Sequence, residues 1–264
     1  MSSQNTNPQN TVVVKIGGRA VETELIRDLT HEIAELAPHV RLIVVHGGGA
    51  EVTRVSELFG IEARFEAGIR MTSNLEMQVV DMILAGKMNK ALVRMLLRSG
   101  ARPVGFCGAD AATVVGIPVT DSTGQTTATG RIERIETGLI NLLLESGYLP
   151  VIASSATTSV GLPLNINADD VAFAVAGAIQ ANHLVFLSDI PGILKQEQVL
   201  RTVTPLDIER EIQTGVIAGG MIPKTRSAEA ALAAGVGSVV IGCYSITGDL
   251  NRLLGNEIGT RIST

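Results

Sequence analysis

Short apolar runs rich in β-branched residues alternate along the chain with longer segments whose apolar residues recur at helical spacing. The runs predict six strands, at residues 12–16, 41–45, 103–106, 149–153, 183–187 and 238–241. The segments between them predict helices at residues 22–36, 50–59, 74–98, 137–145, 168–179, 205–214 and 224–234. Such alternation is typical of an α/β fold, with a mostly parallel sheet that helices cover on both faces.

Two stretches depart from this rhythm. Residues 113–120 and 127–135 are short, Thr-rich and joined by Asp121-Ser-Thr-Gly124, which predicts a β-hairpin inserted into the α/β frame. A similar short insertion at residues 61–70 precedes the long helix predicted at 74–98. Residues 1–11 are polar and predict a disordered tail. From about Asp169 the chain is expected to form a second lobe packed on the first.

Composition narrows the classes of function. Hydrophobic residues make up 45% of the chain and aromatics only 3%, with no Trp, so the core must consist of Val, Ile, Leu and Ala. The formal net charge is -5, and no Lys/Arg stripe interleaves with aromatics, which argues against nucleic acid as a partner. No apolar run reaches the ~18–20 residues that span a bilayer. No secretory signal is visible, so we predict a cytoplasmic protein without a membrane partner.

Cysteines and histidines give no sign of a metal site. Cys107 and Cys243 lack the spacing of metal ligands, and the four histidines form neither an HExxH pair nor a Cys/His cluster. We therefore predict no protein-ligated metal.

Two glycine-rich turns follow the first two strands. Lys15 stands at the end of the first strand and precedes Gly17 and Gly18, which places an ammonium beside exposed backbone N–H groups. The second strand ends in His46 and then Gly47-Gly48-Gly49, which lead directly into a helix whose N-terminus attracts anions. The alternatives are a solvated lysine and a plain strand-to-helix turn. For His46 we expect a hydrogen-bonded structural role.

No familiar nucleotide fingerprint is present. Gly86-Lys87 is followed by Met and has Asp81 where a Walker A loop requires its first glycine, and no G-x-G-x-x-G follows a strand. Three later segments carry polar groups at element boundaries: Asn165-Ile-Asn-Ala-Asp169-Asp170, Ser188-Asp189-Ile-Pro-Gly192 and Gly219-Gly-Met-Ile-Pro-Lys224. Taken singly, each segment has an ordinary structural explanation. The acids of the first would be helix-dipole partners, the second a turn after a strand, and Lys224 of the third a surface lysine.

Taken together, in this order and at these separations, the segments resemble the amino acid kinase family over essentially the whole chain from Val12. The His46-Gly-Gly-Gly turn, Ala67-Gly-Ile-Arg-Met-Thr72, Gly86-Lys-Met-Asn-Lys90 and Gly147-Tyr-Leu-Pro-Val151 are similar to the members that act on N-acetylglutamate. The resemblance implies an open αβα sandwich with inserted β-hairpins over residues 12–264. It further implies an amino-acid-binding N-lobe at about 12–168 and an ATP-binding C-lobe at about 169–264.

The resemblance also implies roles for individual residues. Lys15 and Lys224 match the lysines that stabilise the transferring phosphoryl group, and Asp169 matches the acid that holds both. The substrate-site positions are Gly18, Gly48, Gly49, Arg70 and Asn165. The positions of the adenine-nucleotide wall are Asp189, Ile190, Pro191, Gly192, Ile193, Leu194, Val216, Ile217 and Ala218.

The implied activity is the ATP-dependent phosphorylation of the γ-carboxylate of N-acetyl-L-glutamate, with Mg²⁺ held mainly by the nucleotide. A carboxylate with a pKa near ~4.3 is ionised at pH 7, so the reaction requires no general base. The obstacle is the approach of an anionic nucleophile to an anionic phosphoryl group, which fixed positive charge relieves.

Several alternatives remain open. Phe106, Cys107 and Ala111 depart from the family pattern Gly-Leu-Ser-Gly-x-Asp-Gly, and Arg19 is bulkier than expected, so a differently acylated or carrier-linked amino acid is a possible substrate. A nucleotide- or effector-binding protein without activity is a second alternative, which the presence of every matched catalytic residue opposes. A doubly wound oxidoreductase is a third, opposed by the missing glycine fingerprint.

We also expect a homodimer that is insensitive to arginine. Inhibited members of the family carry an extra N-terminal helix that interlaces dimers into a ring, whereas residues 1–11 have no apolar stripe and contain Pro8. The helix at 74–98 offers apolar positions Met77, Val80, Ile83 and Leu84 for the dimer contact; their alternative is burial against the chain's own sheet.

Overall fold

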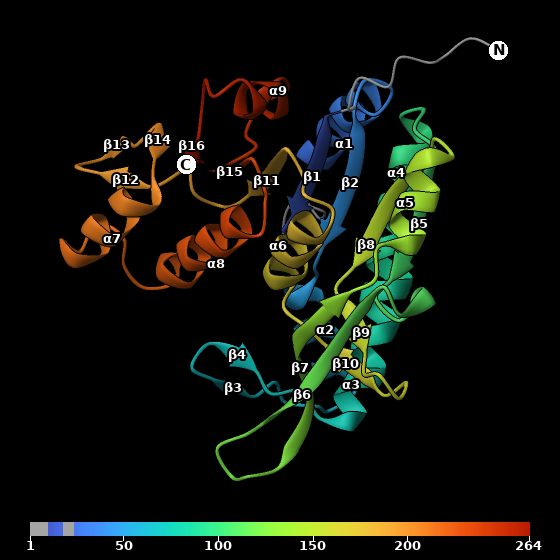
Figure 1. Ribbon diagram of the computed structural model, residues 1–264. Helices are drawn as coiled ribbons and strands as arrows, with labels where there is room; N and C mark the ends of the chain where they lie inside the picture. Colours follow the sequence, from blue (N-terminus) through green and yellow to red (C-terminus); the bar gives the residue numbers. More distant parts are fainter. Residues whose placement is uncertain (1–9, 18–23) are drawn as a thin grey trace.

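The computed structural model describes residues 10–17 and 24–264 and contains a twisted sheet of eight strands at its centre (Figure 1). The order is β14-β16-β15-β11-β1-β2-β8-β5, and every pair is parallel except β15 with β16. All six predicted strands are present. The bounds are β1 Thr11–Ile16, β2 Arg41–His46, β5 Pro103–Cys107, β8 Leu149–Ala153, β11 His183–Leu187, β14 Thr202–Val203, β15 Ser238–Gly242 and β16 Thr260–Ile262.

Helices cover both faces of this sheet, which confirms the predicted α/β sandwich. One apolar cluster joins the sheet to α5, α6 and α8, and a second joins its other face to α1, α9 and the helix after Ser73. The bounds are α1 Leu25–Leu36, α2 Gly49–Leu58, α5 Gly138–Glu145, α6 Ala168–Ala178, α7 Pro205–Gln213, α8 Met221–Ala233 and α9 Asp249–Leu254.

Strand β1 illustrates why β-branched residues dominate the sheet. Val12 and Val14 belong to one apolar cluster and Val13 to the other, because successive side chains of a strand point to opposite faces. A strand buried on both faces therefore needs a continuous apolar run rather than an alternating one. Thr11 is already part of β1 and buried, so the ordered chain begins before the predicted end of the tail. Residues 1–9 lie outside the described residues.

The predicted helix at 74–98 is continuous but not uniform. It consists of α3 (Asn74–Asp81), a π-helical segment η2 (Met82–Met88) and α4 (Asn89–Arg98), and Ser73 caps it as predicted by accepting the Glu76 N–H. Met77, Val80, Ile83 and Leu84 are all at most 6% exposed. The prediction that these four form a dimer contact is therefore wrong: they cover the chain's own sheet, and the exposed apolar side chains of this helix include Leu75, Met82 and Leu97.

Both predicted hairpins are present, at the lower end of the molecule in Figure 1. Strands β6 (Val114–Thr120) and β7 (Thr126–Ile135) close a small barrel with β9 (Ser155–Thr157) and β10 (Pro163–Asn165). The short insertion at residues 61–70 contains the two-stranded hairpin of β3 (Phe65–Glu66) and β4 (Ile69–Arg70).

Sequence patterns missed the shortest elements. A third hairpin, β12 (Leu194–Lys195) and β13 (Gln198–Val199), precedes β14, and a 3-10 turn spans Asp110–Ala112. Helix α8 begins at Met221 rather than residue 224, because Pro223 lies in its first turn, where the missing N–H costs nothing. Within residues 10–17 and 24–264, no helix has the length and apolar character to cross a membrane.

Candidate active site

The carboxyl ends of three adjacent strands meet at one edge of the sheet. β11, β1 and β2 are parallel neighbours, so the turns that follow Leu187, Ile16 and His46 lie side by side. They line a cleft of about 700 Å³. Helices α2 and α6 begin at this cleft, which directs the partial positive charge of two helix N-termini toward it.

A carboxylate between two lysines lies at the centre of the cleft. Lys15 Nζ is 2.7 Å from Asp169 Oδ1, and Lys224 Nζ is 3.6 Å from Asp169 Oδ2. Both ammonium groups also lie over the ring of buried Phe186, at 5.0 and 5.4 Å from its centroid. Lys15 belongs to β1, Asp169 to the first turn of α6 and Lys224 to the first turn of α8, so tertiary structure alone brings the three together.

Gly48 and Gly49, two of the three glycines of the second turn, have different surroundings. A Cβ on Gly48 would lie 2.8 Å from Leu84 Cδ2 and 3.2 Å from Met88 Cγ, so the π-helical segment packs directly on this residue. A Cβ on Gly49 would meet nothing within 4 Å, and Gly49 lines the cleft. Gly48 is therefore required by packing, whereas Gly49 leaves backbone accessible from the cleft.

His46 supports this turn and is hydrogen-bonded as expected. Its Nδ1 lies 3.0 Å from the Gly47 carbonyl oxygen, and its Nε2 is 3.1 Å from Nδ2 of Asn89. Burial lowers the pKa of His46 to about 4, so the ring is neutral at pH 7. Asn89 also donates to the Val151 carbonyl at 3.0 Å, which connects the long helix to β2 and β8.

Arg70 reaches the cleft wall from the end of β4. Its Nη1 forms a 2.7 Å ion pair with Glu76, which is 1% exposed, and its Nη2 donates to Thr53 Oγ1 at 2.5 Å and to the Gly49 carbonyl at 3.2 Å. The guanidinium also lies 4.8 Å from the centroid of the Phe65 ring. Four groups from three elements therefore hold it in one orientation.

Asn165 also lines the cleft and belongs to the small barrel. Its Nδ2 donates to Thr72 Oγ1 at 2.9 Å, and the Thr72 N–H donates to Thr129 Oγ1 at 2.8 Å. Thr129 in turn donates to the Arg70 carbonyl at 2.6 Å. The backbone of Arg70 and the side chain of Asn165 are thus connected through two threonines. Gly18, the remaining expected substrate position, lies outside the described residues.

The expected nucleotide wall is only partly at the cleft. Asp189 lines it, whereas the Ile193 N–H donates to Thr260 Oγ1 of β16 at 2.8 Å. Ile193 and Ile217 are buried in the core at 2% and 1% exposure. Gly192, at φ 146, approaches Thr260 so closely that a Cβ would lie 2.6 Å from its Oγ1. The cleft lining does not include Ile190, Pro191, Gly192, Ile193, Leu194, Val216, Ile217 or Ala218.

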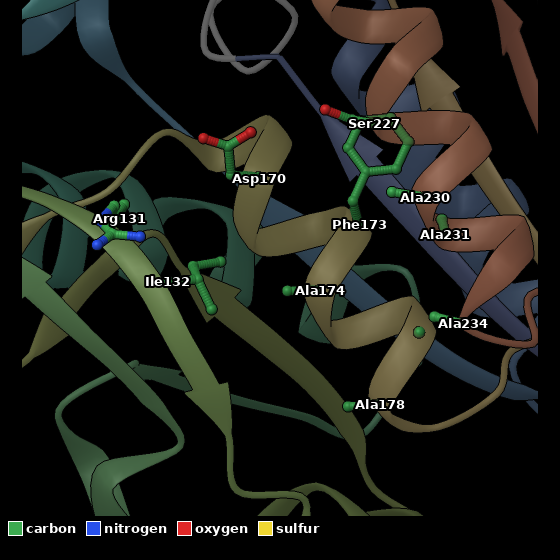
Figure 2. Close-up of a pocket in the computed structure, with 11 residues that line it drawn as sticks. Arg131, Ile132, Asp170, Phe173, Ala174, Ala178, Ser227, Ala230, Ala231 and Ala234 are labelled. Carbon is green, nitrogen blue, oxygen red and sulfur yellow. The ribbon is translucent and has the colours of Figure 1, made fainter.

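Asp169 and Asp170 are neighbouring acids in the first turn of α6, where Figure 2 shows the Asp170 side chain. Burial, together with the neighbouring Asp169, raises the pKa of Asp170. Within the described part of the chain, no three His, Cys, Asp or Glu side chains come together as a metal site would require.

The sequence profile of the amino acid kinase family matches residues 10–243. The chain belongs to the amino acid kinase family. Among relatives, the acetylglutamate kinase of Chlorobaculum tepidum is 36% identical over 95% of this chain and 87% of its own length. The acetylglutamate kinase of Bacillus subtilis is 38% identical over 88% of this chain and 90% of its own.

Solved structures of amino acid kinase fold proteins superpose over nearly the whole chain. A protein from Streptococcus mutans UA159 has a TM-score of 0.78 and 30% identity, with 96% of this chain and 98% of that one covered. The N-acetylglutamate synthase of Neisseria gonorrhoeae, complexed with coenzyme A and N-acetyl-glutamate, has a TM-score of 0.83 at 23% identity, over 97% of this chain and 59% of that one. At this identity the second likeness concerns the fold alone.

Several residues that line the cleft or hold its side chains escaped the sequence reasoning. Thr53 lies one helical turn after Gly49, a spacing that could have indicated it. For Glu76 and Arg131 no such signal exists, because Glu76 resembles an ordinary first-turn acid and Arg131 an exposed strand residue. Their place in the site depends on packing between distant segments.

Proposed function

We propose that this amino acid kinase transfers the γ-phosphoryl group of ATP to the γ-carboxylate of N-acetyl-L-glutamate, forming an acyl phosphate. Two findings support the proposal. The relatives named acetylglutamate kinase match nearly the whole chain at 36–39% identity. The cleft combines two lysines, two helix N-termini and Arg70, which suits the joining of two anions.

Lys15 and Lys224 would supply the charge that the reaction needs. Negative charge spreads over the oxygens of the transferring phosphoryl group, and preorganised cations stabilise that charge. Asp169 would keep the two ammonium groups at a fixed separation, since one carboxylate oxygen faces each of them. No proton has to be abstracted from an ionised carboxylate, and the neutral, buried His46 is not required as a base.

Arg70 and Asn165, which both line the cleft, would bind the acceptor. A planar guanidinium suits the substrate α-carboxylate, and Arg70 is held in place before any ligand arrives. The amide of Asn165 and the open backbone at Gly49 suit the polar groups of the acyl amino acid. Reduced motion of these groups lowers the entropy that binding must overcome.

ATP and Mg²⁺ are the cofactors that the family implies. The lysines and the helix N-termini fit a polyphosphate, and Asp189 extends the cleft toward the expected nucleotide wall. Mg²⁺ would neutralise the phosphate oxygens to which it is bound, held mainly by the nucleotide. Adenine binding by residues 190–194 and 216–218 stays a prediction.

The observation that carries the proposal is the convergence of Lys15 and Lys224 on Asp169. The test is ADP release coupled to NADH oxidation, with ATP, Mg²⁺ and free N-acetyl-L-glutamate, and with hydroxylamine present to trap the acyl phosphate. We expect turnover with N-acetylglutamate and a hydroxamate product. Turnover only with a carrier-linked or differently acylated amino acid would refute the proposed substrate. The absence of any acceptor-dependent ADP release would refute the activity.

We further propose that the enzyme is a homodimer. The exposed side chains of Leu75, Met82 and Leu97 lie on the long helix, whose opposite face is buried, and a second copy would cover them. The cytoplasmic location and the insensitivity to arginine stay predictions.

A further inference from the structure

The hairpin β3–β4 forms part of the cleft although it is too short to be stable alone. Each strand has two residues, and an isolated two-stranded hairpin is marginally stable at best. Phe65, Gly68 and Ile69 nevertheless line the cleft, and Arg70 is the last residue of the hairpin. Phe65 and Ile69 are 57% and 53% exposed, so apolar burial does not hold the hairpin in place.

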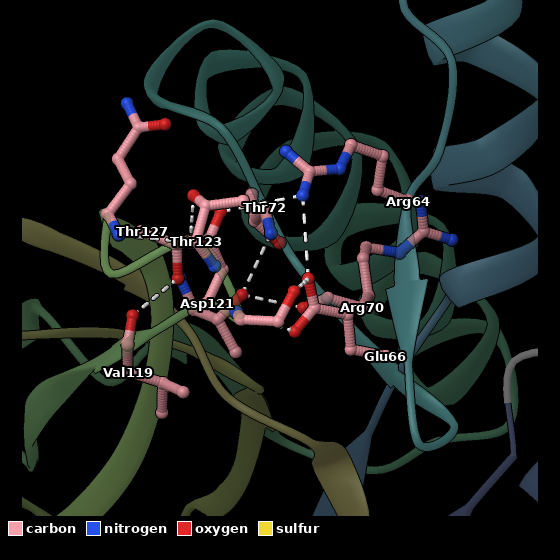
Figure 3. Close-up of polar contacts among 11 residues, drawn as sticks. Arg64, Glu66, Arg70, Thr72, Val119, Asp121, Thr123 and Thr127 are labelled. Carbon is pink, nitrogen blue, oxygen red and sulfur yellow. Dashed lines mark hydrogen bonds and ion pairs between the residues drawn. The ribbon is translucent and has the colours of Figure 1, made fainter.

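A single carboxylate connects the hairpin tip to the rest of the protein. Glu66 Oε2 accepts the Ser122 N–H at 2.9 Å, and Glu66 Oε1 accepts the Ser122 hydroxyl at 2.9 Å. Arg64 Nη2 lies between Glu66 and Asp121, 3.4 Å from an oxygen of each. Across the described ranges, residues 65–69 form hydrogen bonds to other parts of the molecule only through Glu66. Figure 3 shows Arg64, Glu66 and Asp121 facing one another.

The partner of Glu66 is a rigid turn. The Asp121 side chain, 1% exposed, accepts the N–H groups of Thr123 at 3.0 Å and Gln125 at 2.9 Å. Hydrogen bonds from Thr123 and Gln125 keep the pKa of Asp121 below its usual value, so it stays ionised. The Gly124 N–H donates to the Asp121 carbonyl and closes a β-turn with Ser122 at its second position. The turn therefore presents the Ser122 N–H and hydroxyl in a fixed direction.

We propose that Glu66 is a positioning residue for acceptor binding, acting through Ser122. Its two hydrogen bonds hold the β3–β4 hairpin against the β6–β7 turn, and the hairpin places Phe65 and Ile69 at the cleft beside Arg70. Without this contact the hairpin occupies the binding-competent position for only a fraction of the time. The apparent affinity for the acceptor is then the intrinsic affinity multiplied by that fraction, while turnover at saturation is retained. This role presupposes the kinase function proposed above.

Two variants break the contact in different ways. Glu66→Gln keeps the side-chain length but removes the charge and one acceptor oxygen. Ser122→Pro removes both donors, and proline is favoured at the second position of a type I or type II turn, so the turn itself is retained. Glu62→Gln is the matched control, because it makes the same change in charge at an exposed residue four positions earlier.

The experiment measures steady-state kinetics and backbone hydrogen exchange together. We expect Glu66→Gln and Ser122→Pro each to raise the KM for N-acetylglutamate about tenfold, with kcat and the KM for ATP within twofold of the unmodified enzyme. The double variant should be no worse than either single variant, because both remove the same contact. Glu62→Gln should behave as the unmodified enzyme.

Hydrogen exchange separates this proposal from the proposed function. In the absence of any substrate, peptides covering residues 64–71 should exchange faster in both variants than in the control. If the enzyme does not accept N-acetylglutamate but this exchange difference is present, the proposed function fails and the hairpin contact stands. Unchanged exchange, unchanged KM or additive effects in the double variant would each overturn the role of Glu66.

Discussion

Replacing Gly48 and Gly49 separately by alanine tests how the second glycine turn works. A Cβ at Gly48 would lie 2.8 Å from Leu84 Cδ2, well inside the ~3.5–4.0 Å at which carbon atoms attract. The φ of Gly48 is 169°, an extended value open to any residue, so the penalty is purely steric. Overpacking a core destabilises a fold by about 1–3 kcal/mol. The substitution also reduces the conformational entropy of the unfolded chain, which stabilises the fold by about 0.4–1 kcal/mol. Gly48→Ala should therefore destabilise the fold by about 1–2 kcal/mol.

Gly49→Ala is the matched variant. Its Cβ meets no atom within 4 Å, and the residue lies in the first turn of α2, where alanine is favourable. The fold should be unaffected or slightly more stable. Because Gly49 lines the cleft, the methyl group should obstruct a ligand that approaches its backbone, raising the KM for the acceptor on the order of tenfold.

The assay combines urea and thermal unfolding of both variants with coupled ADP-release kinetics. We expect Gly48→Ala to lower the melting temperature by about 2–4 °C for each kcal/mol lost. A Gly48→Ala protein as stable as the unmodified one would show that the π-helical segment does not pack on this turn. A Gly49→Ala enzyme with unchanged kinetics would show that no ligand approaches that backbone.

Four further predictions address the site, the pH dependence and the assembly. Lys15→Ala and Lys224→Ala should each lower kcat on the order of 10²-fold or more while changing the acceptor KM far less, and a raised KM with normal kcat would reverse the assigned roles. Arg70→Lys should weaken N-acetylglutamate binding by about tenfold or more in calorimetry and leave ATP binding unchanged, whereas a selective loss of ATP binding would contradict it. The pKa of His46 is about 4 in the folded protein and 6.5 for an unperturbed histidine, which represents the unfolded chain. The unfolded chain therefore binds the proton first, so the free energy of unfolding is highest above pH 6.5 and falls as the pH is lowered toward 4. The loss is about 2 kcal/mol at pH 5, and His46→Asn should flatten this part of the urea-unfolding profile. Met82→Glu should convert a dimer into monomers in sedimentation, and a sedimentation coefficient unchanged from that of the unmodified dimer would place the interface elsewhere.

The strands and the main helices could be predicted from local patterns. The run Val12–Ile16 has no polar interruption except Lys15, and such runs indicate strands buried on both faces. Ser73 marks the start of the long helix, because a side-chain oxygen there satisfies a free N–H of the first turn. The shortest strands, such as β14 and β16, carry too few residues to show a period, so no local pattern reveals them.

The two cleft lysines were indicated only partly by the sequence. The residue types and their order indicated Lys15, Asp169 and Lys224 through the family resemblance. The distances of 2.7 and 3.6 Å, and the placement of both ammonium groups over Phe186, come only from the packing of α6 on β1 and β11 and of α8 on α6 and β15. Nothing in the sequence around Phe186 distinguishes it from any other strand residue.

The sequence by itself determined which segments form strands and helices, and which turns carry glycine beside charge, because these depend on a residue and its near neighbours. The tertiary structure decided which face of the long helix covers the sheet, since helical spacing reveals an apolar face but not what lies against it. It also decided that Gly48 packs against Leu84 while Gly49 faces the cleft, and that Glu76 and Thr53 hold Arg70. These contacts join residues far apart in the chain, and their distances are set by how the layers pack.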